Sequence, residues 1–104
     1  MREAHVAARV MILGGFGRVG SEVAHYLLTH TPYALTLAAR TPHPLPEAWS
    51  AEQRARVRCL TLDAFQTDAL VRACAEADLV VSCLGPSGVV GSRVADACWA
   101  ACAR

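Results

Sequence analysis

The stretch VMILGGFGRVGSEVAHYLL, residues 10–28, carries four glycines within the seven positions 14–20, between an apolar run and an amphipathic one. Glycine loses more chain entropy on folding than other residues and adds no side chain to a core, so something at these positions requires bare backbone. Residues 9–13 form a short apolar run typical of a strand buried on both faces of a sheet. Residues 21–30 repeat apolar side chains at helical spacing. The stretch therefore predicts a strand, a glycine-rich turn and a helix.

The same alternation continues along the rest of the chain. Apolar segments typical of strands lie at residues 33–40, 57–63 and 78–85, and helical patterns lie at residues 47–56, 67–77 and 88–103. Alternating strands and helices of this length imply parallel strands joined by right-handed crossovers. We therefore expect residues 1–104 to form one α/β domain, a Rossmann-like doubly wound parallel sheet with strand order 3-2-1-4 and flanking helices.

Composition excludes several function classes. The chain is 54% hydrophobic and 18% charged, which is typical of a compact globule. All ten basic residues are arginine, so no lysine can act as a general base or Schiff-base nucleophile. The net charge is only +1, and the arginines are spread along the chain. Arg54, Arg56 and Arg58 come nearest to a cluster, which we expect at a solvated loop or strand entrance. We expect no nucleic-acid partner.

Targeting signals are also missing from the pattern. No apolar run approaches the roughly 18 to 20 residues of a membrane span. Residues 1–9 are too short and too polar for a signal peptide. We therefore expect a cytoplasmic protein with no membrane partner.

The five cysteines include no C-x-x-C pair. Cys98 and Cys102 are four positions apart and would share a helix face, but no histidine lies nearby in the sequence and structural zinc takes four ligands. We expect reduced thiols in a reducing compartment, and no metal site.

A strand that runs through glycines into a helix gathers unpaired N–H groups and the positive end of the helix dipole at one point. Gly15, Gly17 and Gly20 fit G-x-G-x-x-G: the first permits the tight turn, the second lets pyrophosphate approach, and the third lets the helix pack on the strand. Gly14, Gly17 and Gly20 also fit G-x-x-G-x-x-G, so spacing alone does not choose a subclass. The pattern predicts a dinucleotide site built by Gly15, Phe16, Gly17, Arg18, Val19 and Gly20.

The end of the second strand indicates which dinucleotide is bound. Folds that use NAD place an acidic residue about twenty positions past the turn, where it binds the ribose hydroxyls. This chain has Arg40 there, followed by Thr41. A guanidinium pairs bidentately with a 2′-phosphate, so we expect NADP, with NAD as the alternative and Arg18 as a second contact. The competing interpretation of Arg40 is a solvated arginine at a strand end.

The third and fourth strands end in further candidates. The Asp63 carboxylate can accept a hydrogen bond from the adenine amino group, or it can cap the turn that follows. Leu84, Gly85 and Pro86 end the fourth strand beside the first, where small residues leave space for the nicotinamide ribose and pyrophosphate, or simply end the strand. No Ser/His/Asp, Cys/His or Tyr-x-x-x-Lys arrangement is discernible. The domain is therefore expected to hold a cofactor rather than to transfer protons.

Taken together, four segments resemble the N-terminal NAD(P)-binding domain of the saccharopine dehydrogenase family: VMILGGFGRVGSEVAHYLL, LTLAART, LTLDA and DLVVSCLGPSGVVGSRVADAC. The resemblance extends over about residues 9–103. It implies that Gly15, Gly17 and Gly20 line the pyrophosphate, Arg40 and Thr41 the adenosine 2′ side, Asp63 the adenine, and residues 84–86 the nicotinamide half. It also implies reversible hydride transfer at an imine or secondary amine carbon.

Family members continue into further strands and a second α/β domain that supplies the substrate pocket and oligomer contacts. We therefore expect this chain to be a truncated, N-terminal part of a longer oxidoreductase, inactive alone, with its catalytic groups elsewhere. Its fourth strand would be an exposed apolar edge through which the chain self-associates. Two alternatives are an atypical short-chain or NmrA-like reductase, indicated by G-x-x-G-x-x-G and Asp63, and a non-catalytic dinucleotide-sensing module, indicated by the absent acid–base groups.

Overall fold

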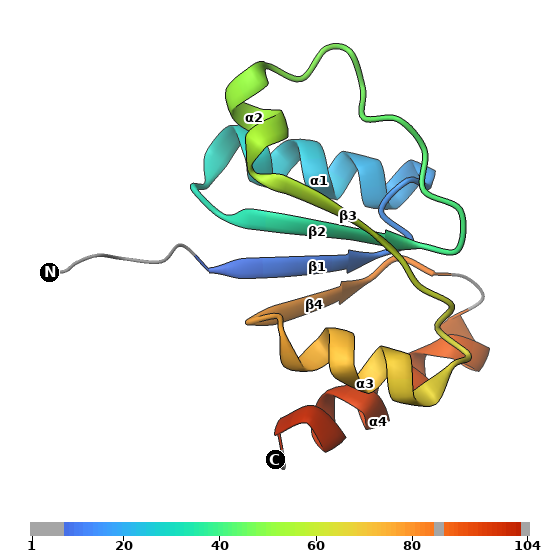
Figure 1. The fold of residues 1–104 in the computed structure, drawn as a ribbon. Coiled ribbons are helices and arrows are strands. Elements are labelled where there is room, and N and C mark those ends of the chain that lie inside the picture. Colours follow the sequence, from blue (N-terminus) through green and yellow to red (C-terminus); the bar gives the residue numbers. More distant parts are fainter. Residues whose placement is uncertain (1–7, 85–86, 103–104) are drawn as a thin grey trace, which may run out of the picture.

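The computed structural model describes residues 8–84 and 87–102. Strands and helices alternate in the order β1 (Arg9–Leu13), α1 (Arg18–His30), β2 (Ala34–Ala39), α2 (Ala51–Ala55), β3 (Val57–Thr61), α3 (Thr67–Ala75), β4 (Leu79–Ser82) and α4 (Ser87–Cys102). Figure 1 shows α1 and α2 on one face of the sheet and α3 and α4 on the other. No helix in the described part of the chain is long and apolar enough to cross a membrane.

The sheet is parallel and has the order β3-β2-β1-β4, which confirms the predicted fold class and strand order. β1 lies in the centre, where Leu13 is in register with Ala38 of β2 and with Ser82 of β4. Parallel strands all end at the same edge. The glycine turn and the loop after each strand therefore meet at this edge, where the strand arrows point in Figure 1.

Side chains of β1 alternate between two cores because successive residues of a strand face opposite sides. Val10 and Ile12 join the core beneath α1, with Leu28 and Trp49 among their neighbours. Met11 and Leu13 join the core beneath α3 and α4, whose members are Met11, Leu13, Ala38, Leu62, Leu70, Cys74, Val94 and Ala97. All four of these β1 side chains are at most 1% exposed. Burial on both faces explains why the run carries no polar alternation.

α1 and α2 begin three and four residues away from their predicted starts. α1 begins at Arg18, three residues before the predicted start, because Gly17 already serves as its N-cap. α2 is confined to Ala51–Ala55, where Ser50 and Gln53 form a capping box: the Ser50 hydroxyl accepts from Gln53 N–H at 3.1 Å, and Gln53 Oε1 accepts from Ser50 N–H at 2.9 Å. Prolines at 42, 44 and 46 keep the preceding residues out of a helix.

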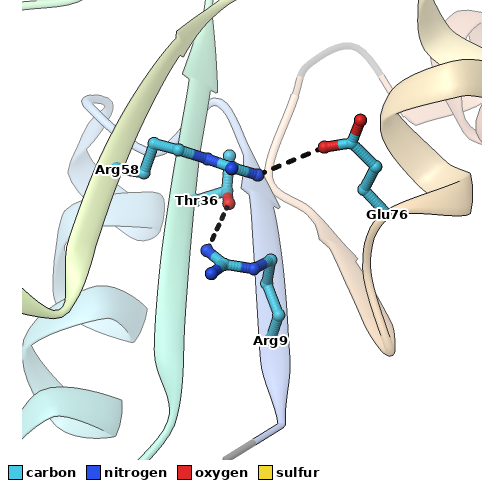
Figure 2. A network of polar contacts seen from close by, with 4 residues as sticks. All are labelled: Arg9, Thr36, Arg58 and Glu76. Carbon is cyan, nitrogen blue, oxygen red and sulfur yellow. Dashed lines mark hydrogen bonds and ion pairs between the residues drawn. The ribbon is translucent and has the colours of Figure 1, made fainter. Parts of the chain in front are cut away.

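Polar contacts hold the sheet together on the α3 side, away from the glycine turn. The side chain of Thr36 is buried, and its hydroxyl oxygen accepts a hydrogen bond from the Arg9 guanidinium at 3.5 Å. Arg58 of β3 reaches across to Glu76, just past α3, at 3.3 Å (Figure 2). Because both partners of the ion pair are more than half exposed, it contributes about 0–1 kcal/mol at most.

The C-terminal end of α1 is held by Arg56, which precedes β3. Its guanidinium donates to the carbonyls of Leu28 at 2.6 Å, Thr31 at 2.7 Å and Tyr33 at 3.0 Å. A cation at this end also matches the negative pole of the helix dipole. The arginine cluster therefore lies at a strand entrance, as the sequence predicts, but Arg56 is engaged in structural contacts rather than solvated.

Candidate functional site

The turn after β1 bends at Gly14, which has a φ of +76°. Its N–H donates to the Ala38 carbonyl of β2 at 2.9 Å, and its carbonyl accepts from Gly17 N–H at 3.0 Å. Left-handed backbone of this kind favours glycine. The prediction that Gly15 permits the tight turn is therefore wrong: this role belongs to Gly14, the first glycine of the G-x-x-G-x-x-G pattern.

The other glycines are required for different reasons. A Cβ on Gly15 would lie 2.9 Å from the Cβ of Leu37, so Gly15 allows the turn to pack on β2. A Cβ on Gly20 would collide with the carbonyl oxygen of Gly14, so bare backbone at this position lets α1 approach the turn. A Cβ on Gly17 would meet only the Gly14 carbonyl oxygen, at 3.4 Å, and would otherwise point into open space. Open space at Gly17 is what an approaching pyrophosphate needs.

The first turn of α1 offers an anion site. Gly17 is its N-cap, no side chain caps the end, and no acidic residue lies in the first turn. The first N–H groups of a helix have no partner within it, and the dipole makes this end positive. Arg18 and Val19 are exposed here, with Val19 at 62%. The arrangement is suited to binding a phosphate group.

A pocket of about 200 Å³ lies at the carboxyl ends of the strands, beside the glycine turn. It is lined by Leu13, Ala38, Ala39, Arg40, Leu62, Asp63, Ala64, Phe65 and Leu84. Typical small-molecule pockets measure about 300–1,000 Å³, so this one fits one part of a dinucleotide rather than the whole. The pocket brings together three predicted site residues, Arg40, Asp63 and Leu84, from three separate strand ends.

The remaining predicted residues lie outside this pocket. Phe16 packs edge-on against His43 with ring centroids 5.8 Å apart, so the proline-rich loop touches the glycine turn. Thr41 is exposed directly after Arg40. Leu84 contacts the turn, because a Cβ on Gly14 would lie 3.1 Å from its Cδ2. Gly85 and Pro86 lie outside the described residues.

Arg40 and Asp63 differ in their contacts with the rest of the chain. Arg40 is exposed, and within residues 8–84 and 87–102 no carboxylate lies within ion-pair distance of its guanidinium. Asp63 is half-buried, and its Oδ1 accepts a hydrogen bond from the Phe65 N–H at 2.9 Å. Asp63 therefore caps its own turn, one of the two roles open to it, while its second carboxylate oxygen remains able to accept from a ligand.

Two residues of the site escaped sequence reasoning. Phe65 forms one wall of the pocket, and the Arg93 guanidinium of α4 lies 5.0 Å from its ring centroid. Arg93 also donates to the Thr67 hydroxyl at 3.1 Å, which ties the start of α3 to α4. The position of Phe65, two residues past Asp63, was the available signal for the wall. Nothing in the sequence indicated its partner 28 positions later.

The thiol at the end of β4 carries no charge at neutral pH. Burial raises the pKa of Cys83 above its ordinary value of 9.0. The backbone N–H of Cys83 donates to the Leu13 carbonyl at 2.8 Å. Among the described residues, no cluster of three or more His, Cys, Asp or Glu side chains could hold a metal ion.

The parallel sheet, the glycine turn and the pocket at the strand ends define a dinucleotide-binding domain of the Rossmann class. The family model described as "Saccharopine dehydrogenase NADP binding domain" matches residues 10–104. The chain belongs to this family of NADP-binding domains.

Similar proteins agree with this assignment. A "Probable mitochondrial saccharopine dehydrogenase-like oxidoreductase" of Arabidopsis thaliana is 33% identical over 101 residues, which covers 86% of this chain and 22% of that protein. Two solved structures share the fold. A Rossmann-fold NAD(P)-binding family protein from Shigella flexneri has a TM-score of 0.71 at 24% identity, over 92% of this chain and 48% of its own. Apo saccharopine dehydrogenase (L-Glu forming) from Saccharomyces cerevisiae has a TM-score of 0.66 at 23% identity, over 88% and 19%. The chain thus spans about a fifth of the curated relative's length.

Proposed function

We propose that this domain presents NADP for reversible hydride transfer at an imine or secondary amine carbon, as the N-terminal part of a longer oxidoreductase. The observation that carries the proposal is that Asp63 and Arg40, which has no ion-pair partner among the described residues, converge on one pocket beside the glycine turn. The nicotinamide supplies the hydride. The acid–base groups and most of the substrate pocket belong to residues outside this chain, which spans 22% of its curated relative.

The cofactor's diphosphate is assigned to residues 15–20. The uncapped first turn of α1 supports this placement, because its positive end and free N–H groups suit a phosphate. The open space around Gly17 supports it as well. Arg18, exposed in the same turn, adds a mobile positive charge.

The adenosine half is assigned to Arg40, Thr41 and Asp63. An arginine fork pairs bidentately with a phosphate, and Arg40 has no competing carboxylate among the described residues. The pocket's volume of about 200 Å³ and its mostly apolar lining suit a single base stacked beside Asp63. Leu84 lines this pocket as well, and Gly85 and Pro86, the two residues that follow it, are assigned to the nicotinamide half.

Titration of the chain with NADPH and NADH, followed by nicotinamide fluorescence, tests this proposal. We expect NADPH to bind more tightly. Arg40→Ala should weaken NADPH binding by about tenfold or more, because hydrogen bonds to charged groups contribute about 1.5–3 kcal/mol and 1.4 kcal/mol is tenfold. NADH binding should not change. Arg58→Ala is the matched control, because this exposed arginine lies near the start of β3, at the opposite end of the strands from the pocket. Equal affinity of the unmodified chain for both cofactors would contradict the role of Arg40.

Two further assignments belong to this proposal. Self-association through β4 is supported by its pairing with β1 alone among the described strands and by Leu79, which is 55% exposed. Light scattering over a concentration series tests it, and a strictly monomeric species would contradict it.

A cytoplasmic location is supported by the five free thiols, which indicate a reducing compartment. Cell fractionation tests that assignment.

A further inference from the structure

Two cysteines meet between the helices on one face of the sheet. The Cys98 thiol of α4 donates a hydrogen bond to the Cys74 sulfur of α3, with the two Sγ atoms 3.7 Å apart. Cys74 is buried in the core beneath these helices, and Cys98 is half-buried and packs against it. Figure 1 shows α3 and α4 side by side below the sheet. Neither thiol contributes to the cofactor site described above.

Geometry excludes the pairing of Cys98 with Cys102 and separates Cys59 and Cys83 from the thiols between α3 and α4. Cys102 lies one turn beyond Cys98 on α4, and residues four apart in a helix have Cβ atoms about 5–6 Å apart, whereas a disulfide requires about 3.5–4.5 Å. Cys83 packs against the core on the opposite face of the sheet. Cys59 is in register with Leu37, which belongs to that same opposite core. Cys74 and Cys98 are therefore the two thiols in direct contact, and the Cys102→Ser variant below tests the remaining pairing of Cys74 with Cys102.

We propose that Cys74 and Cys98 form a redox site, which a peroxide oxidises to a disulfide that links α3 to α4. The Sγ atoms must approach from 3.7 Å to a bond length of about 2.0 Å, which is a side-chain movement rather than a change of fold. Reduction by a dithiol reverses the step through thiol–disulfide exchange.

The reaction proceeds in two balanced steps. The Cys98 thiol loses its proton, its sulfur attacks a peroxide oxygen, the O–O bond breaks, and with hydrogen peroxide the departing hydroxide takes up that proton as water. The Cys74 sulfur then attacks the sulfenic sulfur of Cys98, the S–O bond breaks, and the departing hydroxide takes the Cys74 proton to form a second water. The pair is oxidised by two electrons, and the peroxide is reduced.

The order in which the two sulfurs react follows from their surroundings. Cys98 is the more accessible thiol of the pair, so it meets the peroxide first. Burial, reinforced by the neighbouring Cys98 thiol, raises the pKa of Cys74 to about 12. Cys74 therefore stays protonated in the resting protein and acts in the second step.

The bond would join two helices that follow lining residues of the cofactor site. α3 follows the loop that carries Asp63 and Phe65, and α4 follows Leu84, which lies just past β4. Arg93 already ties these helices together through Thr67. A covalent link between the helices should raise the midpoint of thermal unfolding over that of the reduced chain.

Hydrogen peroxide treatment of the full chain, followed by alkylation of the remaining thiols, tests the proposal without cofactor. Intact mass should show three alkylated cysteines and the loss of two hydrogen atoms, in a monomeric species. Trypsin cleaves after Arg72 and Arg93, so Cys74 shares a peptide with Cys83, and Cys98 shares one with Cys102. Mass alone therefore identifies the two joined peptides, and single serine variants assign the bond.

The variants separate the outcomes. Cys74→Ser and Cys98→Ser should abolish the intramolecular cross-link, while Cys83→Ser and Cys102→Ser should retain it. Far-ultraviolet circular dichroism of each reduced variant shows whether it is folded, and Cys74→Ala and Cys98→Ala replace any serine variant that is not. Retention of the cross-link in a folded Cys74 or Cys98 variant would overturn the proposal. So would a cross-link that forms only between chains, or over-oxidation of Cys98 without any cross-link.

Discussion

The Asp63 carboxylate accepts a hydrogen bond from the backbone N–H of Phe65 at 2.9 Å, so the side chain proposed to bind adenine also shapes the loop that forms the pocket wall. These two roles use different oxygens of one carboxylate, and substitutions can separate them.

Asp63→Asn should keep the conformation of the loop and weaken the binding of the cofactor. The amide oxygen can still accept from Phe65, which leaves the NH₂ group facing the adenine amino group, donor against donor. We expect NADPH to bind about tenfold more weakly, because an unmade buried hydrogen bond costs about 1–3 kcal/mol. Asp63→Ala loses both contacts and should also lower the unfolding midpoint. Fluorescence titration and thermal unfolding measure the two effects, and unchanged NADPH affinity of Asp63→Asn would remove the adenine contact from the proposal.

Gly17→Ala and Gly20→Ala should fail in different ways. A Cβ at position 20 collides with the Gly14 carbonyl oxygen, so Gly20→Ala should be destabilised by about 1–3 kcal/mol or more through overpacking. A Cβ at position 17 points into open space, so Gly17→Ala should fold normally and lose NADPH affinity. Urea unfolding and cofactor titration give the two readouts. Tight NADPH binding by a folded Gly17→Ala variant would show that the pyrophosphate does not approach this glycine.

Arg56→Ala should destabilise the fold by about 2 kcal/mol, because three main-chain carbonyls lose a charged donor. Arg56→Lys should recover only part of this, since an ammonium lacks the planar fork that reaches several acceptors. Arg58→Ala is the control, because its exposed ion pair contributes little. Urea unfolding compares the three variants. A loss of unfolding free energy for Arg58→Ala as large as that for Arg56→Ala would contradict the structural role of the Arg56 contacts.

Stability should fall in alkaline solution through Cys74. Its pKa is raised in the fold to about 12, against an ordinary value of 9.0, so the unfolded chain ionises first as pH rises. The stabilising contribution is complete below pH 9.0 and is lost progressively as pH rises toward 12. Cys74→Ala should flatten this part of the profile of unfolding free energy against pH. An unchanged slope in this variant would assign the effect to other groups.

The order of elements was predictable because each carries a strong periodic pattern. The apolar run at β1 predicts a buried strand, and the helical spacing of α1 predicts a helix packed on it. Strands and helices that alternate along the chain then favour a parallel sheet with right-handed crossovers. The conformation of the glycine turn was less accessible. Two overlapping patterns begin at Gly14 and Gly15, and the contacts of Gly14 with Ala38 and of Gly15 with Leu37 decide between them. These contacts come from β2 and are invisible in local spacing.

The candidate site shows the same division. Strand ends were predictable positions for Arg40, Asp63 and Leu84, because parallel strands end at one edge. The contact of Arg93 with Phe65, by contrast, depends on how α4 packs beside α3. The arginine cluster was placed correctly in the chain, but the carbonyls that Arg56 reaches belong to the end of α1 and the residues just after it, more than twenty residues earlier.

The central position of β1 has a consequence during synthesis. β1 is made before the other described strands, yet one of its two edges pairs with β4, the last strand of the described sheet. On the ribosome, the nascent chain must hold that apolar edge open until residues 79–82 have emerged. An unpaired strand edge can pair with other chains, so the growing polypeptide is open to aggregation through β1 during this interval.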